Sequence, residues 1–259
     1  MQVLKLGGSV ITIKDQDFTV DYRNIRRLAE EIKAAWPTPV VIVHGGGSFG
    51  HPMAKKYDIT DGVTSDRQIH GFAKTHQAMV ELNSIIVNAF LDTGLPAISV
   101  SPSSFIVTDD GRISKVDLEI MGKLVVQGVL PFIFGDAVLD RKKGFTILSG
   151  DQLAVRLAVS LKATKLIFGV DVDGIFTSNP KLFHKARLIE RLESEKVECF
   201  ANIGKSLSTD VTGGMLGKIS EARMAVREGI DVLFVNATEP NVILKALKGE
   251  PVTGTILTG

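Results

Sequence analysis

Residues 40–50 read VVIVHGGGSFG, a continuous apolar run that passes directly into a glycine-rich turn. A run of β-branched residues without polar alternation is typical of a strand that is buried on both faces of a parallel sheet. The same order occurs at residues 3–8, VLKLGG, where a short strand pattern stops at two glycines. Both segments therefore predict strands of one sheet, and ligands of such sheets bind beyond the carboxyl ends of the strands.

Helical patterns alternate with short apolar runs along the rest of the chain. Helices are predicted at residues 21–36, 66–93, 152–161, 216–228 and 241–248, strands at 97–100, 130–134, 166–170 and 232–235, and a hairpin at 105–113. This alternation predicts an α/β protein, a three-layer αβα sandwich with a mainly parallel central sheet. We expect a single domain over residues 1–259 with two lobes.

The composition excludes several classes of protein. With 44% hydrophobic and 23% charged residues, the chain is too apolar to be disordered. The formal net charge is +1, so we expect no nucleic acid and no membrane as a partner. The single cysteine, Cys199, excludes a disulfide framework and fits a cytoplasmic protein. No apolar run reaches the ~18 residues of a membrane span, and no signal-peptide pattern is visible.

Glycine-rich turns occur at residues 7–9, 45–48 and 213–214. Glycine lets backbone N–H groups approach an anion closely, although any one such turn is more often only a tight corner. Three of them favour a ligand with more than one phosphoryl group. No GxxxxGK[ST] motif is present, and the possible GxGxxG at residues 45–50 follows the second strand rather than the first, which disfavours a dehydrogenase.

Lysines accompany these turns. Lys5 lies inside the first strand, where it either faces solvent at a sheet edge or meets an anion, and Lys218 lies one turn past the last glycines. Asp151 either caps the helix that follows it or lies between Lys5 and Lys218 and holds both ammonium groups. Phosphoryl transfer needs mainly positive charge and in-line positioning, and it needs no base when the acceptor is already an anion.

Five motifs occur in order along the chain: KLGGS at 5–9, HGGGSFG at 44–50, SGDQLA at 149–154, GVDVDGIF at 169–176 and DVTGGMLGK at 210–218. As a set they resemble the amino acid kinase superfamily, and HGGGSFGHPMAKKY at 44–57 looks most like its isopentenyl phosphate kinase family. The resemblance implies ATP with Mg²⁺ carried by the nucleotide, isopentenyl phosphate as the small-molecule acceptor, and a homodimer. It also implies that about residues 1–160 bind the acceptor and about 161–259 the nucleotide.

The resemblance further implies roles for individual residues. Lys5, Lys14, Lys218 and Asp151 are expected to be catalytic, and no metal ligand is expected. Acceptor binding is assigned to Gly45, Gly46, His51 and Gly150, with Phe72, His76 and Met79 lining the apolar tail. Nucleotide binding is assigned to Lys5, Gly7, Gly8, Ser9, Gly47, Asp171, Asp173, Gly174, Gly213, Gly214 and Lys218. The imidazole of His51 suits phosphate because it donates a hydrogen bond and becomes cationic near neutral pH.

Two alternatives remain open from the sequence. A fosfomycin-type kinase, or another small-acid kinase of the superfamily, shares much of the glycine-rich loop. An amino-acid acceptor is disfavoured, because Arg67 is the only arginine between residues 36 and 105 that could grip its carboxylate. A non-catalytic nucleotide-binding regulatory module would keep the glycine turns and lose the lysines, whereas Lys5, Lys14 and Lys218 are all present.

Overall fold

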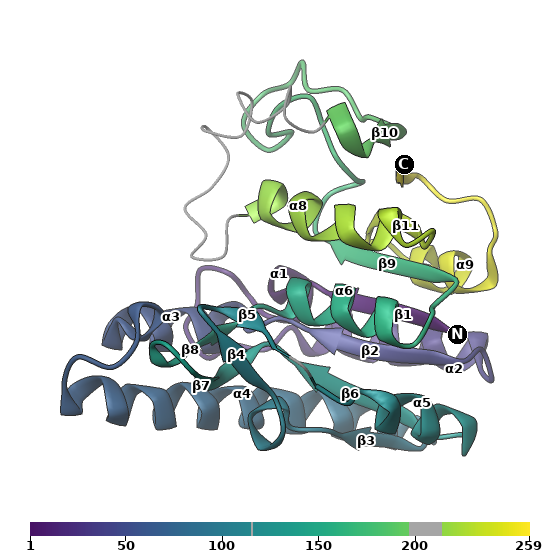
Figure 1. Cartoon of the computed structure of the whole chain (residues 1–259). Coiled ribbons are helices and arrows are strands. Elements are labelled where there is room, and N and C mark those ends of the chain that lie inside the picture. Colours follow the sequence, from purple (N-terminus) through teal and green to yellow (C-terminus); the bar gives the residue numbers. More distant parts are fainter. Residues whose placement is uncertain (115, 197–213) are drawn as a thin grey trace.

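The computed structural model describes residues 1–114, 116–196 and 214–259 (Figure 1). Within these ranges, eight strands form one sheet. Their order is β10 (Arg191–Glu193), β12 (Gly254–Thr258), β11 (Asp231–Asn236), β9 (Lys165–Val170), β1 (Gln2–Leu6), β2 (Val40–His44), β6 (Leu130–Phe134) and β3 (Ala97–Ser99). Every described pair of neighbours is parallel except β11 and β12, which confirms the predicted mainly parallel sheet.

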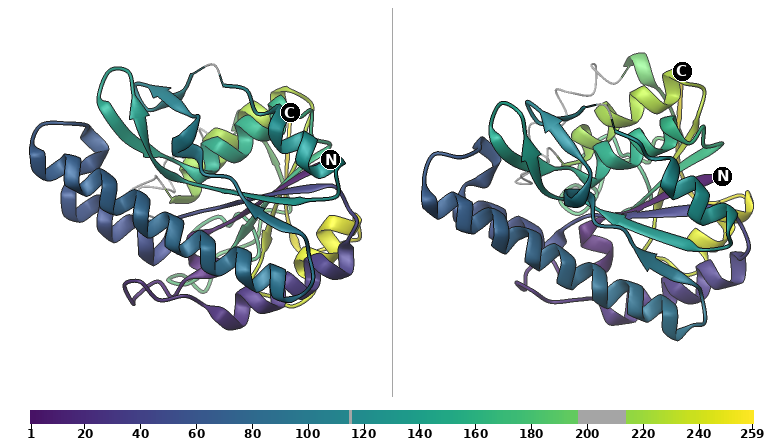
Figure 2. Two further views of the ribbon diagram at one scale, coloured as in Figure 1. Left: turned by 90° about the horizontal axis from the view of Figure 1, so that it is seen from below. Right: turned by 60° about the horizontal axis from the view of Figure 1, so that its bottom comes forward.

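Helices cover both faces of this sheet (Figure 2). One layer contains α2 (Tyr22–Ala35), α4 (Asp66–Asp92) and α9 (Val242–Lys248), and the other contains α5 (Glu119–Val126), α6 (Gly150–Ser160) and α8 (Gly214–Arg227). Strand β2 explains why both faces of the sheet are covered. Val40 and Ile42 pack against the first layer of helices, and Val41 and Val43 pack against the second. Successive side chains of a strand point to opposite faces, so an unbroken apolar run requires two covering layers.

The helices and strands predicted from periodicity are present, and their ends differ from the prediction by at most two residues. The structure also contains elements that the sequence did not predict: helices α1 (Gly8–Ile11), α3 (Gly47–Tyr57) and α5, strand β10, and the short 3₁₀ helices η1 (Ile59–Asp61), η2 (Pro102–Ser104) and η3 (Ser194–Lys196). No helix in the described ranges is long and apolar enough to cross a membrane.

The sequence did not indicate helix α3, because Pro52 lies in its interior. Proline has no N–H to donate to the carbonyl four residues earlier in a helix. That carbonyl belongs to Ser48, and it accepts instead from the backbone N–H of Phe18 at 2.9 Å. A distant segment therefore satisfies the group that proline leaves unpaired, and the helix continues through residue 52.

A second, four-stranded sheet lies beside the first, in the order β5 (Arg112–Ile113), β4 (Val107–Asp109), β7 (Asp136–Asp140) and β8 (Gly144–Leu148). The β4–β5 hairpin confirms the predicted turn, with positive φ at Asp110 and Gly111. The β7–β8 hairpin was not predicted. This hairpin connects the end of β6 to the start of α6. The residues at the start of β7 and at the end of β8 therefore lie beside the main sheet.

Candidate active site

A cleft of about 550 Å³ opens beyond the carboxyl ends of β1, β2 and β9. The turn after each of these strands contributes residues to its wall, and Lys5 of β1 lies at its floor. The strand ends are tied together, because Gly7 donates its N–H to Gly169 at 2.8 Å and Gly45 donates to Leu6 at 3.0 Å. This is the edge of a parallel sheet at which ligands bind.

Asp151 joins the two lysines that the sequence singled out. Its Oδ1 lies 2.7 Å from Lys5 Nζ and its Oδ2 lies 3.4 Å from Lys218 Nζ. Burial alone would raise the pKa of Asp151, which is 4% exposed, but the two ammonium groups hold that pKa below its ordinary value. The carboxylate is therefore ionised near neutral pH, and it fixes two positive charges from opposite ends of the chain at one point of the cleft.

The alternative that Asp151 caps a helix is wrong. Helix α6 begins at Gly150, and its N-cap is Ser149, whose hydroxyl accepts from the N–H of Asp151 at 3.1 Å. Since Ser149 satisfies the end of the helix, the carboxylate of Asp151 is left to the lysines.

His44 supports the second glycine turn from behind. It is fully buried, with Nδ1 3.0 Å from the Gly45 carbonyl and Nε2 3.1 Å from Asn83 Oδ1. Burial lowers the pKa of His44 to about 4, so its ring is neutral near neutral pH. A neutral imidazole carries one N–H, so the ring donates to one of these two oxygens, supports the turn at the end of β2 and adds no charge to the cleft.

On one side of the cleft the wall becomes apolar. His51 and Met79 line this part of the wall. Met79 lies so close to Gly50 that a Cβ atom at position 50 would be only 2.7 Å from Met79 Sδ. The side chain of Met79 therefore packs directly on the glycine turn. Thr75, Ala54 and Ile147 complete this part of the wall.

Phe72 and His76 do not line the cleft in the part of the chain that the structure describes, so their assignment to the tail pocket stays a prediction. Phe72 stacks on Phe145 with 4.9 Å between ring centroids, and His76 turns its Nδ1 to Asp136 Oδ2 at 2.9 Å. This hydrogen bond raises the pKa of His76. Helix α4 is 27 residues long, and only the turns that carry Thr75 and Met79 face the cleft.

On the opposite side, the loop after β9 lines the cleft with Asp171, Gly174, Asn179 and Lys181. Burial would raise the pKa of Asp171, but its ion pair with Lys181 holds that pKa below its ordinary value. Asp173 points elsewhere and accepts from Asn236 Nδ2 at 2.9 Å, so the structure does not bring it to the cleft. Gly213 lies outside the described residues.

The remaining predicted residues do meet in the cleft. Its lining includes Lys14, Gly7, Gly8, Ser9, Gly45, Gly46, Gly47, Gly150 and Gly214. Within the described ranges, no group of three or more His, Cys, Asp or Glu converges in a way that could hold a metal ion.

Comparison with known proteins places this arrangement in a family. The sequence model of the Amino acid kinase family matches residues 1–236. The chain belongs to the amino acid kinase family. It is 41% identical to an isopentenyl phosphate kinase of Methanothermobacter thermautotrophicus, covering 100% of this chain and 99% of that protein. It is 36% identical to the isopentenyl phosphate kinase of Methanocaldococcus jannaschii, covering 98% and 97%.

A solved structure of an isopentenyl phosphate kinase superposes on this amino acid kinase with a TM-score of 0.88, at 38% identity and with 100% of both chains covered. The likeness therefore extends over the whole fold, including the second sheet and the α4 wall of the cleft.

Several polar residues of this kinase's cleft were missed from the sequence, and Thr12 and Lys181 are two of them. Thr12 donates its hydroxyl to the Gly8 carbonyl at 2.9 Å and accepts from the Ser48 N–H at 3.0 Å, so it joins the first two glycine turns. Lys181 supplies a further cation through its pair with Asp171. A lone threonine and a loop lysine carry no periodic or motif signal, and only the fold brings them to the cleft.

Proposed function

We propose that this amino acid kinase transfers the γ-phosphoryl group of ATP to isopentenyl phosphate, giving isopentenyl diphosphate and ADP. An oxygen of the acceptor phosphate forms the new bond to phosphorus as the bond to the bridging oxygen of ADP breaks. The proposal rests mainly on the ion pairs of Lys5 and Lys218 with one buried carboxylate, Asp151, in the cleft. It is supported by relatives that match the chain over its full length and are isopentenyl phosphate kinases.

The lysines supply the catalysis in this proposal. A phosphoryl transition state spreads negative charge over its oxygens, and fixed positive groups stabilise it. Asp151 holds Lys5 and Lys218 in place, so little reorganisation is needed during the reaction. We assign to Lys14 the charge on the departing bridging oxygen, and to the amides of Gly8, Ser9 and Gly47 the remaining contacts to the nucleotide phosphates.

The acceptor is proposed to bind on the side of the cleft formed by residues 1–160, and the nucleotide on the side formed by residues 161–259 together with the first glycine turn. His51, Gly45, Gly46 and Gly150 are assigned to the acceptor phosphate. The prenyl tail is assigned to the apolar wall at Ala54, Met79 and Ile147, since burial of apolar carbon stabilises by about 25 cal/mol per Å².

Mg²⁺ is proposed to enter with the nucleotide. Three of the cleft carboxylates fit poorly as its main ligands, because Asp151 faces two ammonium groups, Asp171 pairs with Lys181 and Asp136 pairs with His76. Mg²⁺ is commonly held by substrate phosphates and water with only one or two carboxylates, which suits this donor set. When bound there, the ion neutralises charge on the nucleotide phosphates.

We also propose a cytoplasmic homodimer. The exposed apolar side chains Ile69 and Leu91 on α4, and Ile98 on the edge strand β3, support a protein contact along this side of the molecule. Sedimentation equilibrium tests the dimer, and a monomer over the whole micromolar range would contradict it.

An acceptor panel tests the function. Purified protein with ATP and Mg²⁺ is given isopentenyl phosphate, acetylglutamate, uridylate or fosfomycin, and ADP release and ³¹P spectra are recorded. We expect a diphosphate signal with isopentenyl phosphate and far slower turnover with the others. Turnover with another acceptor but not with isopentenyl phosphate would overturn the assignment. ATP binding without turnover on any acceptor would favour the regulatory module.

A further inference from the structure

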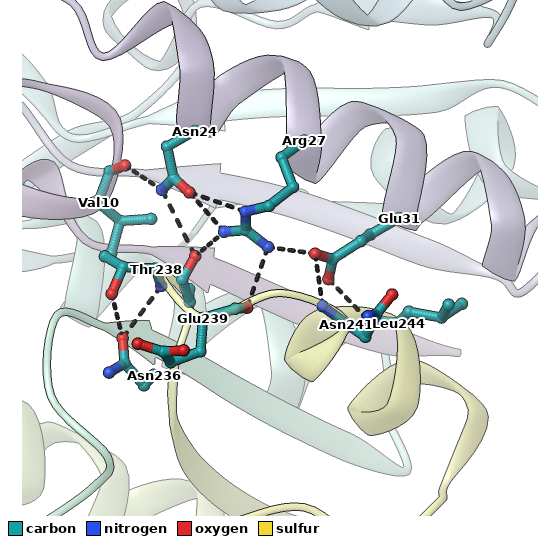
Figure 3. Close-up of polar contacts among 10 residues, drawn as sticks. Val10, Asn24, Arg27, Glu31, Asn236, Thr238, Glu239, Asn241 and Leu244 are labelled. Carbon is teal, nitrogen blue, oxygen red and sulfur yellow. Dashed lines mark hydrogen bonds and ion pairs between the residues drawn. The ribbon is translucent and has the colours of Figure 1, made fainter.

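A polar network joins α2 to α1 and to the segment after β11 (Figure 3). Asn24, Arg27 and Glu31 occupy successive turns of this helix, and none of them is among the cleft-lining residues. Asn24 and Glu31 are only 7% and 6% exposed. Polar side chains are rarely so buried unless hydrogen bonds satisfy their polar atoms. Their partners belong to α1 and to the segment after β11.

Asn24 holds the carboxyl end of α1. Its Nδ2 donates to the Val10 carbonyl at 2.6 Å and also lies 3.4 Å from the Ala237 carbonyl. Helix α1 has only four residues, so its last carbonyls have no partner within the helix. Asn24 therefore fixes the carboxyl end of α1, and the amino end of the same helix places Gly8 and Ser9 in the cleft.

Arg27 fixes the orientation of the Asn24 amide. Its Nε donates to Asn24 Oδ1 at 3.1 Å, which leaves the amide nitrogen to face Val10. The same guanidinium donates to the carbonyls of Ala237 and Glu239. Ala237 in turn donates its N–H to Val170 at 2.8 Å, the residue just before Asp171 of the cleft. The network thus connects α1 to the end of β9.

Glu31 completes the network at a distance from α1. It pairs with Arg27 and accepts from the backbone N–H groups of Asn241 at 2.8 Å and Leu244 at 3.2 Å, at the start of α9. These contacts stabilise the packing of α2 on α9 and include none to the glycine turn. Glu31 lies on the same helix with similar burial and has no contact with α1. Its Oε1 accepts from both Arg27 and Asn241, and its Oε2 accepts from Leu244. Glu31→Gln keeps an oxygen for Arg27 and removes the acceptor of the Leu244 N–H, so it provides a control that leaves Arg27 with its partner.

We propose that Asn24 is a positioning residue for phosphoryl transfer, which sets α1 so that the Gly8 and Ser9 amides face the transferring group. The inference rests on the proposed function of the cleft. A displacement of reacting groups by about 1 Å can lower a rate by about 10²-fold, so a small tilt of α1 is expected to reduce kcat in fully folded protein. A role in stability alone would lower the melting temperature and leave kcat unchanged.

The test compares Asn24→Asp and Asn24→Ala with Glu31→Gln, each assayed well below its melting temperature. Asn24→Asp keeps the shape but has no donor for the Val10 carbonyl. We expect both Asn24 variants to lose tenfold or more in kcat, with KM for isopentenyl phosphate changed less than threefold. Glu31→Gln should lower the melting temperature and keep kcat within twofold of the unmodified protein.

Hydrogen exchange of the amides of residues 8–12 gives a readout besides activity, and we expect it to accelerate in the Asn24 variants and not in Glu31→Gln. Unchanged kcat and unchanged exchange in folded Asn24→Asp would overturn the proposal. If Asn24→Ala does not fold, Arg27→Lys replaces it, with a smaller loss of kcat expected and an unchanged kcat counting against the proposal. If the unmodified protein fails to turn over isopentenyl phosphate, the function is wrong, whereas Asn24 is still tested by the exchange and by whichever acceptor does react.

Discussion

The backbones of Gly8 and Gly47 are in direct contact, since a Cβ built on Gly8 would come closer than 3.0 Å to both N and Cα of Gly47. Gly47 also has a φ of 47°, which disfavours any other residue there. The two turns that carry the proposed nucleotide and acceptor phosphates therefore meet with no side chain between them. This contact allows two phosphorylated molecules to approach head to head.

Replacing Gly8 with alanine should separate these turns. We expect Gly8→Ala to lose about 10²-fold or more in kcat, because a methyl group that overlaps the Gly47 backbone forces a shift of the size that disrupts reacting geometry. Gly94→Ala is the control, since a Cβ at that position would have no atom within 4 Å and its cost is backbone strain alone. Steady-state kinetics on both variants, with thermal melts to confirm folding, make the comparison. Near-normal turnover of Gly8→Ala would contradict the close approach.

Removing either lysine of the Asp151 pair should reduce the rate without unfolding the protein. Loss of one preorganised electrostatic donor typically costs about 10²–10³ in kcat, and we expect Lys5→Ala and Lys218→Ala to fall in that range. Lys123→Ala is the control, because its side chain is 76% exposed on α5. A kcat within a few-fold of normal in either cleft variant would remove that lysine from the mechanism.

His51 should act on acceptor binding. A hydrogen bond to a charged group is worth about 1.5–3 kcal/mol, which corresponds to a rise of about 10–150-fold in KM for isopentenyl phosphate in His51→Ala. KM for ATP should stay the same. His70→Ala, an exposed histidine of α4 outside the cleft lining, serves as the control. An unchanged acceptor KM in His51→Ala would return His51 to a structural role.

Asp140 should stabilise the second sheet in a pH-dependent way. Its carboxylate accepts from the N–H groups of Gly111 at 2.7 Å and Lys143 at 2.8 Å and from the Thr108 hydroxyl at 2.8 Å. Burial would raise the pKa of Asp140, but these donors hold it well below its ordinary value.

A depressed carboxyl pKa stabilises the folded state above the unfolded pKa of about 3.9, and that contribution is lost as the pH falls through the folded pKa. Asp140→Asn should therefore lower the free energy of unfolding by about 2 kcal/mol at pH 7. Urea melts from pH 7 to pH 2 should show the difference from the unmodified protein shrinking below about pH 4. A difference independent of pH would show that the charge of Asp140 contributes nothing.

The main sheet was predictable because burial leaves a strong pattern in the sequence. Residues 40–43 have no polar member, and the helix that begins at Tyr22 repeats its apolar residues with helical spacing and has Asp21 as its N-cap. Helix α3 was missed because Pro52 and the glycines around it argue locally against a helix, and the bond from Phe18 that compensates comes from a distant segment. The β7–β8 hairpin likewise depends on pairing outside the local sequence.

The part of the candidate site that could be predicted consists of residues within recognisable sequence motifs. Lys5, Asp151 and Lys218 belong to glycine-flanked motifs at strand or helix ends, and parallel topology brings such ends together. Phe72 and His76 share a helix face with Met79 in the sequence, yet which turns of a 27-residue helix reach a cleft depends on packing. Thr12 and Lys181 act through contacts that no local pattern encodes.

A crystal structure with ADP, a planar phosphoryl mimic such as aluminium fluoride, and isopentenyl phosphate tests the central assignment most directly. We predict that the mimic lies between ADP and the acceptor phosphate, with the Nζ atoms of Lys5 and Lys218 both within hydrogen-bond distance of it and Asp151 still bound to both. A mimic held elsewhere, with either lysine directed away from it, would contradict the account.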